Sequence, residues 1–309
     1  MIFKKPNFWK NINLLSLILL PLSLFTLLIN NLKSIIVKEY RFNIPIICIG
    51  NIYVGGTGKT PLSIYVYNML KKKKFRPAVI KKYYSSHLDE INLTKSKVKH
   101  FFSDKKRSLS ILKAEQKKNN VIIMDDGLQD FSIKKRLNII CFNSLDLIGN
   151  GFLIPAGPLR DQLEKVKKCQ IVIINGKRNL SFEKKLRLIS NRIKIFQSKY
   201  EIKKLNKYKG KELLAFAGIG NPENFFSLLQ SYKFKIKEKI SFPDHYNYKK
   251  NEIKKIILKA KEKKLKLITT EKDYFRIKQL GFTKIDFIPV NLKIIKNKIF
   301  EKEVLKNLC

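Results

Sequence analysis

Short apolar runs alternate with longer lysine-rich stretches along most of this chain. The apolar runs are rich in β-branched residues and have the length of buried strands. We predict strands at residues 45–49, 78–80, 121–124, 138–142, 171–174, 213–217, 266–269 and 286–289. Helices are predicted at residues 60–72, 222–231 and 249–263. Because apolar strands that alternate with helices are typical of parallel sheets covered on both faces, the pattern predicts an α/β fold.

The start of the chain does not follow this alternation. Residues 11–32 contain no charged side chain and are mostly apolar, and about 20 such residues are enough to cross the hydrocarbon core of a bilayer. A cleaved signal peptide is the main alternative, but the run is followed by Lys33, Lys38 and Arg41 and by no small-x-small cleavage site. A re-entrant or interfacial helix is a further alternative. We expect a retained membrane anchor at residues 1–35.

Two α/β patterns follow this segment, and a lysine-rich connector around residues 199–211 separates them. No internal repeat relates the two patterns to each other. We therefore predict a first α/β domain at residues 36–205 and a smaller α/β lobe at residues 206–309.

The chain carries a formal net charge of +41, from 65 Lys and Arg against 24 Asp and Glu. A polyanionic partner would explain this excess, and so would the amino-acid usage of a genome that favours lysine. The lysines are spread along the chain rather than confined to one stripe, which favours the second explanation. The sequence also has no recognisable nucleic-acid reader motif. A general affinity for anionic membranes follows from either explanation.

The cysteines indicate neither a disulfide framework nor a zinc site. Cys48, Cys141, Cys169 and Cys309 form no C-x-x-C pair, and no histidine lies near them at the spacing of metal ligands. This usage fits a reducing cytosolic setting.

A glycine-rich segment lies between a predicted strand and a predicted helix. It reads Gly55, Gly56, Thr57, Gly58, Lys59 and Thr60. Glycines let backbone N–H groups turn inward around a phosphate at a helix N-terminus, which is the P-loop arrangement. In such a loop Lys59 would neutralise the β- and γ-phosphates, and the Thr60 hydroxyl would bind Mg²⁺. The strict spacing has glycine where this chain has Tyr53, so a glycine turn that only happens to precede a lysine is the alternative.

A second motif is an apolar strand that ends in two acids, Asp125 and Asp126. In P-loop proteins such a strand places a carboxylate beside the metal at the carboxyl edge of the sheet. Paired acids alone can also be a solvated turn, but the glycine-rich segment upstream favours metal binding. The two motifs together predict ATP and Mg²⁺ as cofactors.

Further motifs follow these two in a fixed order. The first motif is GN at Gly50 followed by VGGTGKTP at Val54. The others are DDGLQ from Asp125, PAGPLR from Pro155, FAGIGNP from Phe216, FPDH from Phe242 and TTEKD from Thr269. It resembles the motif series of the tetraacyldisaccharide 4'-kinases of lipid A biosynthesis. The resemblance covers the chain from about residue 45 to about residue 275, and six ordered motifs are far more specific than one P-loop.

The resemblance implies transfer of the γ-phosphate of ATP to the 4'-hydroxyl of a tetraacyldisaccharide 1-phosphate. It implies a P-loop NTPase-like parallel-sheet domain and a smaller α/β C-terminal lobe with the site in the cleft between them, behind an N-terminal membrane helix. The implied location is the bacterial inner membrane, with the catalytic domain on the cytoplasmic face. The implied partners are an anionic glycolipid substrate and the membrane surface, with no nucleic acid and no obligate protein partner.

The resemblance also implies catalytic roles for Lys59, Asp89 and His245. Asp89 would be the base that accepts the hydroxyl proton, and His245 would orient or tune it. His87, beside Asp89, is a competing candidate for this second role.

Three further residues have implied roles at the phosphates and the acceptor. Asp161 is implied as a metal ligand in addition to Thr60, Asp125 and Asp126. Tyr83 and Arg160 are implied to bind the substrate. For Arg160 the alternative is an ion pair with Asp161 or Glu164 on the surface.

This chain departs from the family pattern at several places. The family's Pro-Leu-Arg-Glu ends here in Asp161, a shorter acid that could still reach a metal through water. The family's R-G-Y-G-R segment appears as residues 81–85, KKYYS, without either glycine, and the second histidine of F-P-D-H-H is Tyr246. A membrane-associated P-loop ATPase that acts as a switch or motor is the alternative function. Such ATPases carry a lysine at the start of the loop, where this chain has Val54 and its uncharged neighbours. They also lack the later motifs of this chain, so both features argue against this alternative.

Overall fold

The computed structural model describes residues 6–202, 205–244 and 246–308. The chain divides into two compact units, each with its own sheet and core. The large unit comprises residues 6–83, Lys97–Lys199 and residues 292–308. The small unit comprises Tyr84–Ser96 and Tyr200–Asn291.

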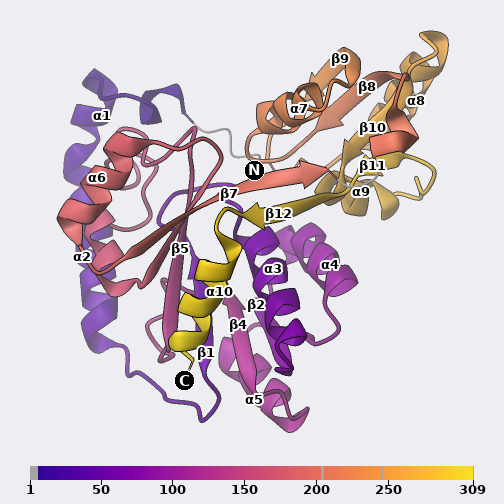
Figure 1. The fold of residues 1–309 in the computed structure, drawn as a ribbon. Helices are drawn as coiled ribbons and strands as arrows, with labels where there is room; N and C mark the ends of the chain where they lie inside the picture. Colours follow the sequence, from indigo (N-terminus) through magenta and orange to yellow (C-terminus); the bar gives the residue numbers. More distant parts are fainter. Residues whose placement is uncertain (1–5, 203–204, 245, 309) are drawn as a thin grey trace. The chain divides into compact units, whose positions relative to one another are not determined.

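The large unit is built on an eight-stranded sheet with the strand order β12-β7-β6-β5-β1-β4-β2-β3 (Figure 1). Its strands are β1 (Ile46–Gly50), β2 (Pro77–Lys82), β3 (Phe101–Asp104), β4 (Val121–Asp125), β5 (Leu137–Asn143), β6 (Ile171–Asn175), β7 (Lys194–Ile202) and β12 (Val290–Ile294). The pairs from β3 across to β7 are parallel. Every residue of the central strands β1 and β4 is buried, which confirms the α/β fold that the apolar runs predict.

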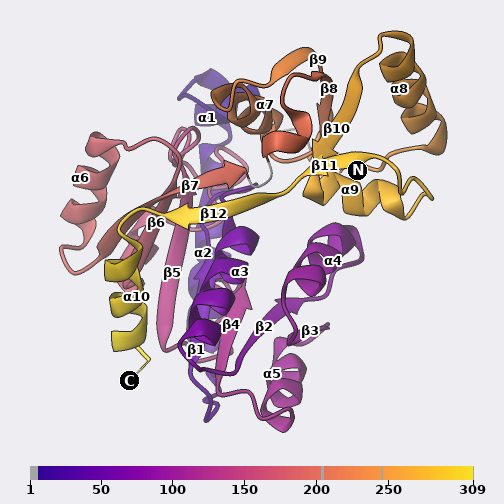
Figure 2. The same ribbon diagram turned by 45° about the vertical axis from the view of Figure 1, so that its right-hand side comes forward.

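Four helices pack against this sheet: α3 (Lys59–Lys72), α5 (Arg107–Gln116), α6 (Leu180–Ile189) and α10 (Asn297–Lys306). Helices α3 and α10 lie side by side (Figure 2), and the ring of Phe300 contacts Tyr65 and Phe196. Ile111 of α5 packs in the same buried cluster as Ile80 of β2. The sheet is thus enclosed by apolar helix surfaces, and its carboxyl edge is left to the loops that carry the motifs.

The uncharged N-terminal run forms two helices, α1 (Leu14–Ile18) and α2 (Leu20–Ile36), instead of one. Leu19 ends the first helix, and Pro21 lies in the first turn of the second. One face of α2 is bonded to a loop of the same unit, because Ser23 and Thr26 donate hydrogen bonds to the carbonyl oxygens of Leu153 and Ile154 at 2.8 and 2.6 Å. On the other faces most leucine, isoleucine and phenylalanine side chains are exposed.

Among the helices of residues 6–202, 205–244 and 246–308, none has both the length and the apolar character needed to cross a bilayer. The prediction of a membrane-spanning N-terminal helix is therefore not supported. The uncharged run is divided at Leu19 into two shorter helices. The second of these, α2, also carries polar side chains on one face, so neither helix is a continuous apolar span.

The small unit is built on a four-stranded parallel sheet with the order β11-β10-β8-β9. Its elements are α4 (Leu88–Lys97), β8 (Glu212–Ala217), α7 (Pro222–Ser231), β9 (Lys235–Ser241), α8 (Lys250–Glu262), β10 (Lys266–Thr270), α9 (Glu271–Lys278) and β11 (Asp286–Ile288). Alternate residues of β8 face different cores: Leu213 packs with Phe226 of α7, whereas Leu214 packs with Ile253 of α8. Two helices therefore cover the two faces of this sheet.

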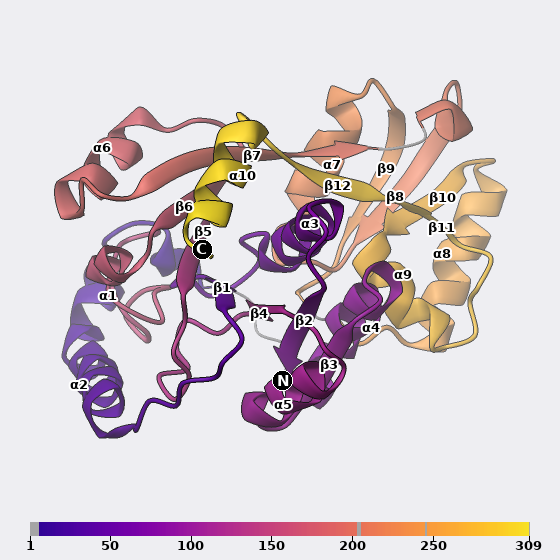
Figure 3. The same ribbon diagram turned by 60° about the horizontal axis from the view of Figure 1, so that its bottom comes forward.

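Two segments fall outside the predicted domain boundaries. Tyr84–Ser96 belongs to the small unit although it precedes most of the large unit's sheet in sequence. Its helix α4 lies beside α9 (Figure 3), and Asp89 of this segment is ion-paired with Arg276 of α9. Residues 292–308 return to the large unit, where α10 buries Phe300 and Val304 completely.

Candidate functional site

The glycine-rich loop of the large unit has the backbone of a phosphate-binding turn. It connects β1 to α3, with Gly55 and Gly58 in the left-handed region at φ 120° and 91°. Gly58 is the N-cap of α3, and no described side chain caps the first turn. The buried Thr57 hydroxyl also has no hydrogen-bond partner within the described residues. The loop therefore offers backbone N–H groups and a hydroxyl to an anion at a helix N-terminus.

The loop tolerates Tyr53 because the backbone there is not a glycine turn. The left-handed residues nearby are Gly55 and Gly58, not residue 53. Tyr53 forms an antiparallel bridge with Leu159, and its buried side chain packs in the same cluster as Leu153. Position 53 is thus an extended core residue, and the departure from the strict spacing leaves the turn at residues 55–60 intact.

Thr60 and Asp125 lie together at the carboxyl edge of the sheet. The Thr60 hydroxyl donates to Asp125 Oδ2 at 2.9 Å, and Asp125 is completely buried. The second carboxylate oxygen, Oδ1, is also buried and has no hydrogen-bond partner within the described residues. A hydroxyl and a carboxylate are oxygen ligands of the kind that Mg²⁺ prefers, so these two residues fit the predicted metal. The ammonium of Lys81 lies 2.7 Å from the same Oδ2.

The other acid of the pair, Asp126, binds the cations of the site. Arg160 donates from Nη2 to Asp126 Oδ1 at 2.9 Å, and Lys59 Nζ lies 3.8 Å from that oxygen. Burial raises the pKa of Asp126, but the charges of Lys59 and Arg160 outweigh it and hold the pKa well below its usual range. The partner of Arg160 is thus Asp126, not Asp161 or Glu164. An incoming phosphate would compete with this carboxylate for the two cations.

Asn51 connects the residues of this cluster through hydrogen bonds, although the sequence motifs assign it no role of its own. Its side-chain amide donates to the Tyr53 carbonyl at 2.6 Å, and its own carbonyl accepts from Arg160 at 2.9 Å and from Gln129 at 3.0 Å. Arg107, also missed, donates to the Asp126 carbonyl at 2.6 Å. Asn51 and Gln129 stand inside the quoted motifs, which is the signal that could have found them. Arg107 stands in none.

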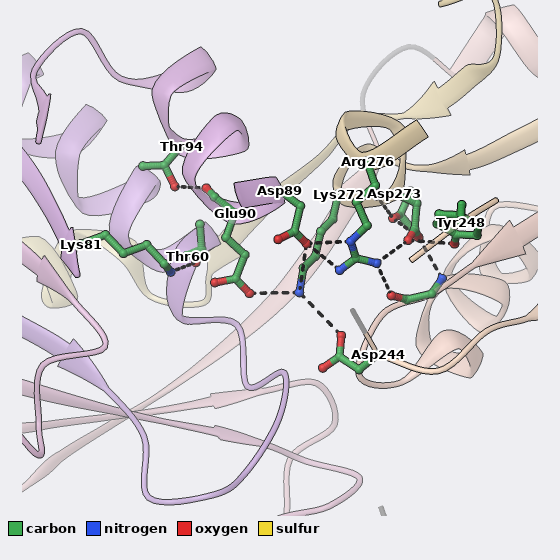
Figure 4. A network of polar contacts seen from close by, with 12 residues as sticks. Thr60, Lys81, Asp89, Glu90, Thr94, Asp244, Tyr248, Lys272, Asp273 and Arg276 are labelled. Atoms are coloured by element: carbon green, nitrogen blue, oxygen red, sulfur yellow. Dashed lines mark hydrogen bonds and ion pairs between the residues drawn. The ribbon is translucent and has the colours of Figure 1, made fainter. Parts of the chain in front are cut away.

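The predicted base, Asp89, lies in the small unit and is buried at the start of α4. Arg276 of α9 donates to Asp89 Oδ2 from Nε at 2.9 Å, and Lys272 Nζ lies 3.7 Å from the same oxygen (Figure 4). Lys272 also pairs with Glu90 at 3.0 Å and Asp244 at 3.6 Å. Burial lowers the pKa of Lys272, but these three carboxylates outweigh it and raise the pKa.

A second carboxylate fixes the helix that carries these cations. Asp273 is completely buried and accepts from the Gly218 N–H at 2.9 Å, the Tyr248 hydroxyl at 3.0 Å and Arg276 at 2.8 Å. Burial and the charge of Asp273 raise the pKa of Tyr248, which keeps its hydroxyl a donor. Asp273 therefore orients Arg276, while Arg276 and Lys272 hold Asp89.

The remaining predicted residues have fewer partners. Tyr83 follows β2 with its side chain 39% exposed, and Asp161 is buried and accepts from the Gln162 N–H at 3.0 Å. Burial raises the pKa of Asp161. His245 lies outside the described residues. Across the described part of the chain, no three His, Cys, Asp or Glu side chains gather closely enough to hold a metal ion without other ligands.

Comparisons with known proteins agree with each other. A family model described as tetraacyldisaccharide-1-P 4'-kinase matches residues 15–101 and 89–309. The chain is 38% identical to the tetraacyldisaccharide 4'-kinase of Pelagibacter ubique over 98% of both chains. It is 33% identical to that of Rickettsia bellii, over 88% of this chain and 89% of the relative.

A solved structure also resembles the whole chain. It is LpxK from Aquifex aeolicus in complex with ATP, with a TM-score of 0.72 and 22% identity over 96% of this chain and 100% of that one. At this identity the likeness concerns the fold.

Proposed function

The chain belongs to the tetraacyldisaccharide 4'-kinase family, and we infer from this that it transfers the γ-phosphate of ATP to the 4'-hydroxyl of tetraacyldisaccharide 1-phosphate. The use of ATP as phosphate donor is supported by the phosphate turn at residues 55–60. Lys59 of this turn and Arg160 both pair with Asp126, and Thr60 donates to Asp125. The acceptor half rests on family membership. A switch or motor ATPase has no support in the relatives.

In this reaction the bond between the γ-phosphorus and the bridging β-oxygen breaks, and a bond to the 4'-oxygen forms. Negative charge develops on the phosphate oxygens, so the ammonium of Lys59 and the guanidinium of Arg160 stabilise them once Asp126 releases these cations. Thr60 and Asp125 would hold Mg²⁺, with Asp126 and Asp161 as further candidate ligands. When bound, the metal neutralises charge on the transferred phosphate.

We assign the proton of the 4'-hydroxyl to the Asp89 carboxylate. Arg276 and Lys272 both contact Oδ2 of Asp89, so the two cations fix one face of the carboxylate in the small unit. Arg276 is in this view a positioning residue, and Asp273 keeps it in place. His245 would tune the base, and Tyr83 and Arg160 would bind the substrate.

We propose that α1 and α2 attach the protein to the cytoplasmic surface of the inner membrane. Five apolar side chains of these helices are each at least 50% exposed, namely Leu14, Leu24, Phe25, Leu28 and Ile35. Ser23, on the other face of α2, donates to the Leu153 carbonyl. A helix with such a face lies in the interface plane, and the net charge of +41 adds attraction to anionic headgroups. The lipid substrate would be met at this surface.

The reaction is tested with purified protein in detergent, γ-labelled ATP, Mg²⁺ and tetraacyldisaccharide 1-phosphate. Label should move to the lipid, and Lys59→Met should abolish the transfer, whereas Lys71→Met on the exposed part of α3 should not. ATP hydrolysis without labelled lipid would replace this function by the switch or motor ATPase.

A further inference from the structure

The ammonium of Lys81 lies where the predicted metal ligands meet. Lys81 stands beside Asp125 in the parallel register of β2 and β4, so both side chains reach the carboxyl edge of the sheet. Lys81 Nζ is 2.7 Å from Asp125 Oδ2. It is 3.3 Å from Thr60 Oγ1 (Figure 4). The Lys81 side chain is only 5% exposed. A buried lysine therefore contacts both oxygen ligands of the candidate Mg²⁺ site.

A structural ion pair alone would not need this position. Taking both charges out of water costs free energy, and a buried pair is often no more stable than apolar residues of the same volume. The Asp125 carboxylate also keeps Oδ1 without a hydrogen-bond partner within the described residues, so Lys81 satisfies only one of its two oxygens. The site is thus neutralised by a single charge on a flexible stem and retains an oxygen for another ligand.

We propose that Lys81 is a tethered cation that occupies the metal position between Thr60 and Asp125 and keeps divalent ions out until nucleotide arrives. The inference rests on the proposed function, since it takes the metal to accompany ATP. Phosphate bound at residues 55–60 would add negative charge beside this site and offer the displaced ammonium new acceptor oxygens. Metal and nucleotide would then bind together, and the nucleotide-free protein would bind the metal weakly.

The test uses Mn²⁺ as the probe, with free Mn²⁺ followed by electron paramagnetic resonance in the absence of nucleotide. Lys81→Met removes the charge and keeps the length of the side chain. It should tighten Mn²⁺ binding about tenfold or more, because like charges that share a buried site oppose each other by at least one power of ten in affinity. Lys82→Met, one residue further along β2, is the matched control and should bind Mn²⁺ as the wild type does. With saturating ATP the difference between Lys81→Met and wild type should shrink.

Thermal unfolding and ATP binding are measured on the same samples. If Lys81→Met does not fold, Lys81→Gln, which keeps a polar side chain without the charge, should show the same tighter Mn²⁺ binding. Unchanged nucleotide-free Mn²⁺ affinity in a folded Lys81 variant would overturn the inference while ATP binding stands. If the wild-type protein itself did not bind ATP, the proposed function would be overturned instead.

Discussion

Cations of both units are held by carboxylates of the same chain. In the large unit Asp126 pairs with Lys59 and Arg160, and in the small unit Asp89 pairs with Arg276. Such pairs keep long basic side chains in place before a substrate binds. At Lys59 and Arg160, a phosphate would have to compete with the carboxylate of Asp126. On the proposed function, this competition would lower the phosphate affinity of the two cations.

Replacement of Asp89 by Asn separates catalysis from nucleotide binding. The amide cannot accept the hydroxyl proton, so turnover should fall by about 100-fold or more, while the KM for ATP should stay near the wild-type value. Glu262→Gln, at an exposed position of α8 in the same unit, is the control and should change turnover little. An equal loss of turnover and of ATP affinity would assign Asp89 to binding.

The lowered pKa of Asp126 makes part of the stability depend on pH. Its folded pKa lies below the unfolded value of about 3.9, so the ionised carboxylate stabilises the folded state above about pH 4 and loses this effect as pH falls toward the folded pKa. Urea unfolding at several pH values should show Asp126→Asn less stable than wild type at pH 7. The difference should narrow below about pH 4. A difference that stays constant with pH would mean that the charge of Asp126 is not its source.

Residue types in motifs identified Lys59, Thr60 and Asp125 from the sequence, and the structure brings these three into one site. The partners of Asp89 were not identified, because Arg276 is 187 positions away in sequence and no spacing rule joins them. The motif comparison placed Lys81 only in the altered segment at residues 81–85. Its contact with Asp125 depends on the register of two strands, which sequence periodicity does not supply.

At the scale of elements, helix α2 has a polar face and an apolar face. Ser23, Thr26 and Asn30 bond the helix to the loop at residues 153–160, at 2.8, 2.6 and 2.8 Å. The spacing of three and seven residues places them on one side of the helix. The apolar residues are left to face outward, so the proposed membrane attachment would start from a helix whose orientation is already fixed.

Glutamates on the outward face should weaken membrane binding. The double variant Leu24→Glu and Leu28→Glu replaces two side chains that are 54% and 56% exposed. Its binding to anionic vesicles should fall about tenfold or more, since apolar area and charge both change unfavourably. The pair Leu145→Glu and Leu188→Glu is the control, because these leucines are exposed elsewhere on the large unit. Equal losses in sedimentation assays would mean that net charge alone attaches the protein.

The predicted strands are confirmed at all eight positions, whereas β3, β7, β9 and β12 were missed. The missed strands are those with polar or alternating residues: β9 reads KIKEKIS, with every second residue exposed. Such a strand resembles a lysine-rich loop in a chain that has lysine nearly everywhere. Apolar run length is a sufficient signal only for strands buried on both faces.

At the scale of the whole molecule, each unit has its own hydrophobic core, so a core defect should stay local. Phe226→Ala in the small unit should lower that unit's free energy of unfolding by about 3–5 kcal/mol. The fluorescence of Trp9, which is buried in the large unit, and the affinity for ATP should both remain, because the phosphate loop belongs to the large unit. Circular dichroism and Trp9 fluorescence followed in urea would measure the two transitions. Leu258→Ala, on an exposed position of α8, is the control; a Trp9 transition that shifts with Phe226→Ala would show that the units unfold together.

The insertion of Tyr84–Ser96 into the small unit has a consequence for how the protein is made. The strands β10 and β11 and the helix α9 that complete this unit lie between Lys266 and Ile288, far behind α4, which ends at Lys97. At about 5–20 residues per second, α4 emerges from the ribosome roughly 10–40 s before its partners exist. During that interval the apolar side chain of Ile91, buried in the finished protein, has no core of its own unit to enter. The nascent chain therefore passes through a stage at which the segment that carries Asp89 is open to chaperones, and Asp89 gains Arg276 only near the end of synthesis.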